Sequence, residues 1–263
     1  MSSAAAFARA RANGRSALVG YLPAGFPTCD DGITAMRAMV DAGVDLIEVG
    51  MPYSDPVLDG PTIQAATELA LRAGARIADV LRTVAAVADL GADVVVMTYW
   101  NPVLRYGVER FATDLANAGG AGLITPDLIP DEAEEWLQVS DRQNLDRVFL
   151  VAPSSSPGRI ASTAEACRGW VYAASTMGVT GARAATSSVA PELVDKVRSV
   201  SELPVGVGLG VSNGSQAAEV ATYADGVIVG SALVRCLLDA PDVASGVRSL
   251  AGLVGELAAA VRA

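Results

Sequence analysis

Two carboxylates on either side of a turn-rich segment give this sequence its clearest indication of chemistry. Residues 45–64 are DLIEVGMPYSDPVLDGPTIQ, with Glu48 before the turns and Asp59 after them. Glu48 interrupts an apolar run, residues 46–50, that is typical of a short buried strand. Because an unpaired carboxylate is costly to ionise in such surroundings, Glu48 is a candidate acid or base.

The residue types that the sequence lacks narrow the mechanism further. The chain contains no histidine, which argues against a Ser/His/Asp triad, a Cys/His pair and a His-ligated zinc ion. Its one lysine, Lys196, falls in an expected helix away from the strand ends, where it is badly placed for Schiff-base chemistry. Carboxylates, tyrosines and hydroxyls therefore remain for proton transfer, and backbone amides remain for holding anions.

Two glycine-rich segments near the end of the chain are suited to binding an anion. Residues 206–214 (GVGLGVSNG) begin within one expected strand and run past its end, and residues 230–234 (GSALV) follow the next strand and indicate a short helix. Glycines let backbone N–H groups approach a phosphate, and the N-terminus of a helix adds a favourable dipole. The same glycines would also suit tight turns alone, so the residues themselves leave both interpretations open.

A third segment, residues 175–183 (STMGVTGAR), is small, polar and punctuated by glycine. This composition fits a mobile lid over a substrate, and it fits an ordinary surface loop equally well. Nothing in the residues themselves decides between these two interpretations.

Eight short β-branched runs are expected to position these segments. They alternate with longer amphipathic stretches, a pattern that favours parallel strand–helix units over hairpins. The expected strands are residues 17–21, 46–49, 94–98, 122–125, 148–151, 171–174, 205–207 and 227–229, and the expected helices include 32–42, 62–73, 77–90, 108–118, 131–138, 191–200 and 216–223. A further helix is expected at the N-terminus. Strands spaced by roughly 25 to 30 residues favour a (β/α)₈ TIM barrel, an α/β fold, over an open doubly wound sheet.

The chain length suits one such barrel. A TIM barrel typically takes ~250 residues, and this chain of 263 residues shows no linker or low-complexity segment, so a single domain over residues 1–263 is expected. No G-x-G-x-x-G fingerprint follows the first strand, which weakens a dinucleotide-binding alternative. Loops at the C-terminal ends of barrel strands build the active site. Glu48 and the loop 51–60 are therefore expected at the catalytic face.

Composition indicates a large core and an acidic surface. Hydrophobic residues make up 51% of the chain and charged residues 18%, against roughly 25% charged in an average soluble domain. The net charge of −10 argues against nucleic acid and anionic membranes as partners, since neither would meet a basic patch. No charge-free apolar run of 18 residues is present, and the arginine-containing N-terminus does not resemble a secretory signal. Cys29, Cys167 and Cys236 are widely spaced and odd in number, so reduced thiols and a cytoplasmic protein are expected.

Six ordered motifs point to a known family. They are LIEVGMPYSDPVLDGPTIQ, MTYWNPVLRYG, the Pro126-Asp127 loop, VYAASTMGVTG, VGLGVS and DGVIVGSALV. Through them the sequence resembles the tryptophan synthase alpha subunit across nearly its whole length. The resemblance implies retro-aldol cleavage of indole-3-glycerol phosphate to indole and D-glyceraldehyde 3-phosphate. It also implies an alpha2beta2 assembly in which indole passes through a tunnel to a pyridoxal-phosphate beta subunit, with no cofactor and no metal in this chain.

The resemblance also implies roles for individual residues. Glu48 would protonate the indole ring carbon, and Asp59 would accept a hydrogen bond from the indole N–H. Glu48 should then have a raised pKa, whereas Asp59 on a wetter loop should stay ionised. The implied substrate and phosphate contacts are Tyr21, Ile63, Tyr99, Tyr172, Thr180, Gly181, Gly208, Leu209, Gly210, Gly230 and Ser231. The implied surface facing the beta subunit includes Asp55, Asn101, Pro102 and Asp127, with residues 101–106 as a loop.

Three other functions remain open on the sequence alone. The same site would serve a free-standing indole-3-glycerol-phosphate lyase that releases indole without a partner. Another phosphate-binding barrel, such as an isomerase of an aminoaldose phosphate, would need a different carboxylate pair on other strands. A catalytically idle subunit that only activates a partner would have no need of a buried acid, so Glu48 and Asp59 argue against it.

Overall fold

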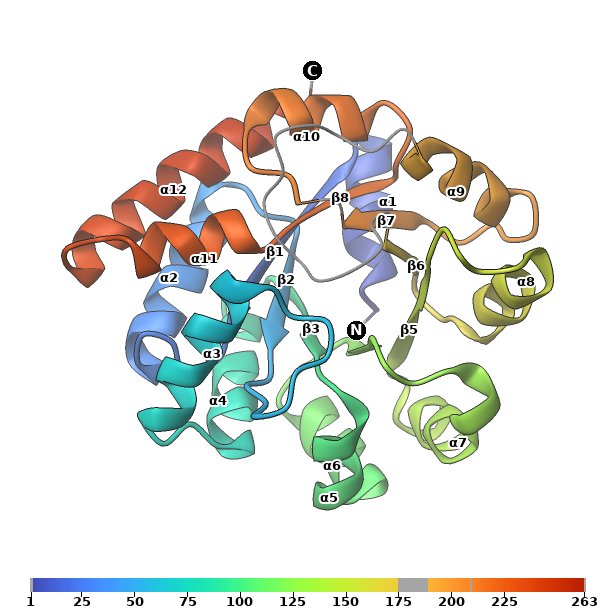
Figure 1. Cartoon of the computed structure of the whole chain (residues 1–263), viewed down its shortest axis with the longest axis horizontal. Helices are drawn as coiled ribbons and strands as arrows, with labels where there is room; N and C mark the ends of the chain where they lie inside the picture. The colour runs from blue at the N-terminus through green and yellow to red at the C-terminus, as the bar shows by residue number, and fades with distance from the viewer. Residues whose placement is uncertain (1, 175–188, 209, 263) are drawn as a thin grey trace.

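Eight parallel strands close into a barrel in the computed structural model, which describes residues 2–174, 189–208 and 210–262 (Figure 1). Each strand pairs with its sequence neighbours, and β1 pairs with β8 to close the sheet. The strands are β1 (Ala17–Pro23), β2 (Leu46–Gly50), β3 (Asp93–Met97), β4 (Gly122–Thr125), β5 (Asp146–Val151), β6 (Val171–Ala174), β7 (Val205–Gly208) and β8 (Gly226–Val229). The predicted TIM barrel is confirmed.

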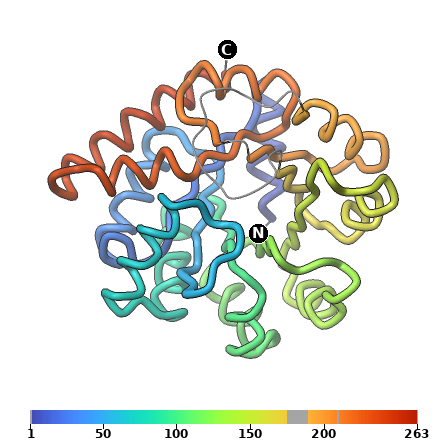
Figure 2. Tube along the Cα trace, in the orientation of Figure 1, coloured from blue at the N-terminus to red at the C-terminus, as the bar shows by residue number. Residues whose placement is uncertain are grey.

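Helices surround the barrel: the first lies across its floor, and the others form a ring around its outside. They are α1 (Ala4–Ala12), α2 (Cys29–Ala42), α3 (Pro61–Arg72), α4 (Ile77–Ala88), α5 (Trp100–Tyr106), α6 (Val108–Asn117), α7 (Glu134–Gln143), α8 (Pro157–Ala166), α9 (Val189–Arg198), α10 (Gly214–Ala221), α11 (Ser231–Leu238) and α12 (Val243–Ala260), with a 3₁₀ turn η1 (Pro130–Glu132) before α7. α12 packs against α2, so helices from the two ends of the chain complete the ring (Figure 2). The predicted N-terminal helix is α1, and the predicted helix after the eighth strand is α11.

Two helical segments differ from the sequence-based expectation. Residues 101–106, expected as a loop, belong to α5, which begins at Trp100. Pro102 is tolerated there because the first turn of a helix does not use its N–H groups within the helix. The helix expected over 131–138 instead begins at Glu134, because Pro130 first starts the 3₁₀ turn.

α12 is the one helix of the described chain that is long and apolar enough to span a membrane by length and composition. It contains Arg248 and Glu256, and it packs against α2, α10 and α11. Its buried positions include Leu250, Val254 and Leu257. In this structure α12 is therefore part of the helical layer around the barrel.

The strands separate an outer apolar core from an inner one. In β2, Ile47 packs in the outer core under the helices, whereas Leu46 packs in the inner core along the barrel axis. Because side chains alternate along a strand, Glu48 points the same way as Leu46, into the barrel. Trp170 also belongs to the inner core, and Tyr172 packs against it.

Aspartates at the N-terminal ends of four strands hold the N-terminal segment at the floor of the barrel, opposite the catalytic face. Three of them form ion pairs: Asp93 at the start of β3 with Arg9, Asp225 before β8 with Arg11, and Asp45 before β2 with Arg15. The fourth, Asp146 at the start of β5, is fully buried. These four aspartates were not predicted from the sequence to act together.

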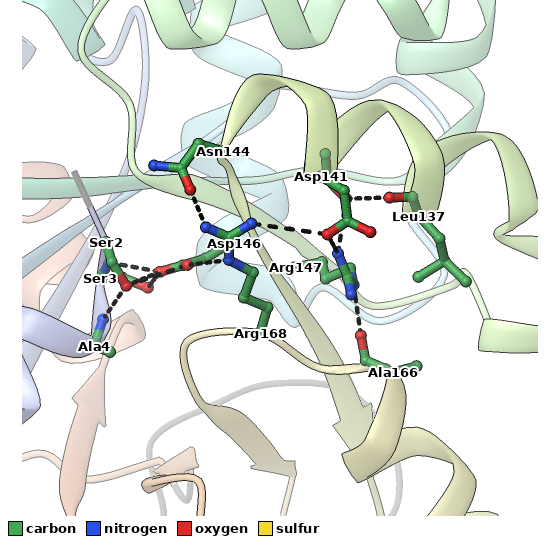
Figure 3. A network of polar contacts seen from close by, with 11 residues as sticks. Ser2, Ser3, Ala4, Leu137, Asp141, Asn144, Asp146, Arg147, Ala166 and Arg168 are labelled. Carbon is green, nitrogen blue, oxygen red and sulfur yellow. Dashed lines mark hydrogen bonds and ion pairs between the residues drawn. The ribbon is translucent and has the colours of Figure 1, made fainter.

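Asp146 anchors the start of α1 through hydrogen bonds (Figure 3). Its Oδ2 atom accepts bonds of 2.6 Å from both the backbone N–H and the hydroxyl of Ser3, and one of 2.9 Å from the hydroxyl of Ser2. Ser3 is the residue immediately before α1. The aspartates therefore fix α1 as the floor of the barrel.

Candidate active site

Glu48 lies inside the barrel with almost no contact with water. It is 1% exposed, and the strand register places it between Tyr21 of β1 and Val95 of β3. Its Oε2 atom has no hydrogen-bond partner within the part of the chain that the structure describes. Burial raises the pKa of Glu48 from its usual value to about 8, because a charged carboxylate would lose its hydration there. The predicted raised pKa is confirmed, and the group can donate a proton at neutral pH.

Asp59 lies on the loop after β2, where Tyr99 holds it. Its Oδ1 atom accepts a 3.0 Å hydrogen bond from the hydroxyl of Tyr99, whose oxygen accepts one of 2.9 Å from the N–H of Leu58. Asp59 is half-buried and Glu48 only 1% exposed, so the loop that carries Asp59 is the wetter of the two sites, as expected. Burial raises the pKa of its carboxyl, and the hydrogen bond from Tyr99 lowers it. The charge of Asp59 therefore depends on Tyr99, a residue that was predicted only to line the indole pocket.

Two partly buried tyrosines complete the surroundings of Glu48. Burial is the main cause that raises the pKa values of Tyr21 and Tyr172 far above the usual value, and the charge of Glu48 raises both further. Asp59, Tyr99 and Tyr172 also raise the pKa of Tyr21. These effects link the five predicted site residues electrostatically.

Each of these tyrosines occupies space that a glycine of the neighbouring strand leaves free. A Cβ atom on Gly50 of β2 would lie 2.2 Å from the hydroxyl oxygen of Tyr21. A Cβ atom on Gly208 of β7 would lie 2.4 Å from that of Tyr172. A larger residue at either glycine would force its tyrosine to move. Gly208, predicted as a phosphate ligand, therefore also sets the position of Tyr172.

The start of α11 and the loop after β7 form the candidate phosphate site. Gly230 precedes α11 and offers no side-chain cap, whereas Asn213 before α10 and Asp242 before α12 both cap their helices. Gly230 therefore leaves the N-terminus of α11 without a capping side chain of its own, and N–H groups and the helix dipole favour an anion there. Gly210 has a φ of 72°, a left-handed conformation that favours glycine.

The other predicted ligands of the site divide into two groups. Ser231 is the buried first residue of α11, and Ile63 lies in the first turn of α3, in the outer core against which Tyr21 also packs. Thr180, Gly181 and Leu209 lie outside the described residues, as does the predicted lid, residues 175–183.

The residues predicted to face a partner lie on the segments that follow β2, β3 and β4. Asn101 of α5 donates a 3.0 Å hydrogen bond to the hydroxyl oxygen of Tyr53 on the loop after β2. Asp127, after β4, accepts hydrogen bonds of 2.9 and 3.2 Å from the backbone N–H of Trp100. These contacts join the three segments, which follow the labelled strands β2, β3 and β4 (Figure 1). The surface that they form is named the partner surface, and its segments carry Asp55, Asn101, Pro102 and Asp127.

Three exposed apolar side chains on the same segments were not identified from the sequence. Val57 after β2 is 69% exposed, Leu104 after β3 is 54% exposed and Ile129 after β4 is 41% exposed. Scattered exposed apolar residues are normal, but several on adjacent segments are typical of an interaction site. Each segment carries two adjacent aliphatic residues, Val57-Leu58, Val103-Leu104 and Leu128-Ile129, and the sequence does not show which member of each pair is exposed.

The arrangement combines a proton donor, a carboxylate and an anion site. Buried Glu48 can give and take a proton, Asp59 can stabilise a nearby positive charge, and the uncapped start of α11 can hold a phosphate. Among residues 2–174, 189–208 and 210–262, no three His, Cys, Asp or Glu side chains are grouped to hold a metal ion.

Comparison with known proteins points to one family. The profile of the family described as "Tryptophan synthase alpha chain" matches residues 7–262. The tryptophan synthase alpha chains of Salinispora arenicola and Mycobacterium tuberculosis are 63% and 62% identical to this chain, over 98% and 97% of it and 96% and 93% of those proteins. A structure of Mycobacterium tuberculosis tryptophan synthase matches with a TM-score of 0.94 and 60% identity, over 99% of this chain and 98% of that one.

Proposed function

Because this chain belongs to the tryptophan synthase alpha chain family, it cleaves indole-3-glycerol phosphate to indole and D-glyceraldehyde 3-phosphate, and we propose that Glu48 and Asp59 perform the cleavage. The observation that carries this proposal is the burial of the Glu48 carboxyl inside the barrel, which raises its pKa to about 8. A carboxyl in such a site can act as a general acid and then, once ionised, as a general base.

The proton follows a closed cycle in this proposal. Glu48 donates its proton to C3 of the indole ring, and the ring nitrogen takes up the resulting positive charge. The carboxylate of Glu48 then removes the proton of the glycerol hydroxyl beside the ring, while the bond between C3 and the glycerol carbon breaks. The bonding electrons return to the ring, the hydroxyl carbon becomes the aldehyde, and Glu48 is again protonated.

Asp59 stabilises the transient positive charge. Tyr99 holds its Oδ1 atom, so Oδ2 is the oxygen that would accept the indole N–H. A hydrogen bond to an ionised acceptor is about twice as strong as a neutral one. Tyr21, Ile63, Tyr99 and Tyr172 border the indole, while Gly208, Leu209, Gly210, Gly230 and Ser231 hold the phosphate, and Thr180 and Gly181 close over the site.

We assign the partner surface to a beta subunit in an alpha2beta2 assembly in the cytoplasm. The exposed Val57, Leu104 and Ile129 favour a bound partner over a free-standing lyase, because burying them would remove apolar surface from water. We assign pyridoxal phosphate to the beta subunit. The only lysine of this chain, Lys196, lies exposed on α9, far along the chain from Glu48 and away from any strand end.

Two substitutions in the site test the catalytic assignment. Glu48→Gln keeps the size of the side chain but removes the acid, so we expect indole formation to fall by about 10² to 10⁴. Asp59→Asn should also impair the reaction severely. Glu68→Gln, on the exposed face of α3, is the matched control. Near-normal turnover by Glu48→Gln would refute the mechanism, whereas activity in Asp59→Asn alone would refute only the role of Asp59.

The partner assignment has its own test. We expect the cleavage rate to rise when the cognate beta subunit is added, and Leu104→Asp to weaken beta binding by about tenfold or more, since a charge would have to be desolvated in the interface. Val200→Asp is the control, because Val200 is equally exposed but lies after α9. A high rate that ignores the beta subunit would favour the free-standing lyase.

A further inference from the structure

Three aromatic rings form a column inside the barrel, from its floor to the active site. The ring centroid of Phe7, on α1, lies 5.2 Å from that of Trp170. Trp170 in turn stacks on Tyr172, with centroids 5.6 Å apart and an angle of 28° between the planes. Tyr172 is one of the two tyrosines whose pKa the charge of Glu48 raises. The column therefore connects α1 to the surroundings of the proposed acid.

Glycines on β7 and β8 leave each ring its space. A Cβ atom on Gly226 of β8 would lie 2.6 Å from the ring of Phe7, and one on Gly206 of β7 would lie 2.7 Å from the ring of Trp170. Gly208 leaves the corresponding space beside Tyr172. Each ring is thus seated directly against the backbone of a neighbouring strand, where any side chain would displace it.

Trp170 contributes its aromatic ring to the column, and its Nε1–H group makes no hydrogen bond within the described residues. Trp170 is 0% exposed, and its Nε1 atom has no hydrogen-bond partner among the residues that the structure describes. A buried N–H group without a partner costs free energy that an apolar side chain would avoid. What tryptophan offers at this position is a large flat ring between Phe7 and Tyr172.

The lower end of the column is held firmly in place. Asp146 binds Ser2 and Ser3 at the start of α1, and its Oδ1 atom lies 3.7 Å from the guanidinium of Arg168 (Figure 3). Arg168 is two residues before Trp170 in the chain. The same aspartate therefore fixes both α1, which supplies Phe7, and the segment that leads into Trp170.

We propose that Trp170 is a positioning residue for the cleavage, because it supports the ring of Tyr172 from below and so fixes the face that Tyr172 presents to the substrate beside Glu48. This inference rests on the proposed function, in which Tyr172 contacts the substrate. When the side-chain ring of Trp170 is removed, a space opens beneath Tyr172, and the ring of Tyr172 can tilt into that space. A displacement of about 1 Å in an active site can lower the rate by about 10²-fold.

Steady-state indole formation by the full chain tests this role. Trp170→Leu removes the ring, and Trp170→Phe keeps a ring that can stack. Trp136→Leu is the control, since Trp136 is equally buried and its Nε1 is also without a partner in the described residues, but it lies on α7 outside the barrel. We expect kcat to fall about tenfold to a hundredfold in Trp170→Leu, with KM changed less than about threefold. Trp170→Phe should recover most of kcat, and Trp136→Leu should keep it.

Several outcomes would overturn the role of Trp170. One is an equal kcat in Trp170→Leu and Trp136→Leu, and another is a loss that Trp170→Phe does not restore. Where circular dichroism shows that Trp170→Leu does not fold, Trp170→Met replaces it, because it also removes the flat ring that stacks on Tyr172 but fills more of the space; a kcat equal to that of Trp136→Leu there would also overturn the proposal. A wild-type chain that forms no indole would instead refute the proposed function, so the two failures are distinguishable.

Discussion

Tyr99 donates a 3.0 Å hydrogen bond to Asp59, and this bond joins the start of α5 to the loop after β2. Tyr99 is the residue immediately before α5. The first residues of the same helix bind Tyr53 through Asn101, and Asp127 through Trp100. One short helix therefore connects a proposed catalytic carboxylate with the partner surface, and a shift of α5 would alter the bond to Asp59.

Removal of the Tyr99 hydroxyl is expected to weaken catalysis. A hydrogen bond to a charged group contributes about 1.5–3 kcal/mol, so Tyr99→Phe should lower kcat/KM by about tenfold or more. Because the bond from Tyr99 lowers the pKa of Asp59, its loss should move the acidic limb of the pH profile to higher pH. Tyr223→Phe is the control, since the hydroxyl of Tyr223 has no partner in the described chain. Identical pH profiles for the two variants would contradict this role.

The rate of cleavage is expected to fall as the pH rises through about 8. Burial raises the pKa of Glu48 to about 8, and above that pH the carboxyl loses the proton that it must donate. The measurement is kcat for indole formation as a function of pH in the wild-type chain. A kcat that stays constant well above this pH would show that a different group is the acid.

The stability of the fold should also depend on Glu48. Between pH 4.5 and about 8 the unfolded chain ionises this carboxyl while the folded chain keeps it protonated. The folded state then binds more protons, so the free energy of unfolding decreases as the pH rises. Glu48→Gln removes this dependence and should gain up to about 5 kcal/mol over wild type near pH 8. Urea unfolding near pH 4.5 and near pH 8 measures this gain over wild type. Glu68→Gln keeps Glu48, so its stability should change with pH as that of wild type does.

An acidic residue at the start of α11 should block phosphate binding without unfolding the protein. Asp is a favoured residue before a helix, and a Cβ atom on Gly230 would make only ordinary contacts of 3.5 Å with Tyr21. The carboxylate of Gly230→Asp would occupy the anion site and repel phosphate, so we expect KM to rise by about tenfold or more. Gly252→Asp, on the exposed face of α12, adds the same charge elsewhere. An equal KM in both variants would rule out this phosphate site.

The anchoring of α1 can be measured through Asp146. Asp146→Asn replaces an acceptor of several hydrogen bonds with a group that must also donate, so buried donors on Ser3 lose their partner. We expect a loss of about 2–4 kcal/mol in the free energy of unfolding. Asp141→Asn, in the same network but exposed, should cost less than about 1 kcal/mol (Figure 3). Chemical denaturation measures the free energy of unfolding of both variants. Similar losses of that free energy would mean that Asp146 is not the anchor.

The strands and the direction of Glu48 could be predicted because both follow from short-range patterns. Alternation within β2 places Leu46 and Glu48 on one side, and the order of strands follows from the chain. α5 could not be predicted, because seven residues that include Pro102 are too few to show a helical period.

Contacts between residues that are far apart in the chain could not be predicted from the sequence. Tyr99 and Asp59 are 40 positions apart, and nothing in either motif shows that a hydroxyl of one segment would reach the carboxylate of the other. The attachment of α1 did leave a signal: Asp45, Asp93, Asp146 and Asp225 each stand at or just before an apolar strand. That repeated position indicates a shared role, but only the fold shows that the partners lie around α1.

The fit of each tyrosine against a glycine has a consequence for how this protein evolves. The residue types within each pair, Gly50 with Tyr21 and Gly208 with Tyr172, constrain one another, because a Cβ atom on the glycine would collide with the tyrosine. A side chain larger than glycine fits only where the tyrosine has become smaller. In related chains, a larger residue at either glycine position should therefore occur only together with a smaller residue in place of the tyrosine.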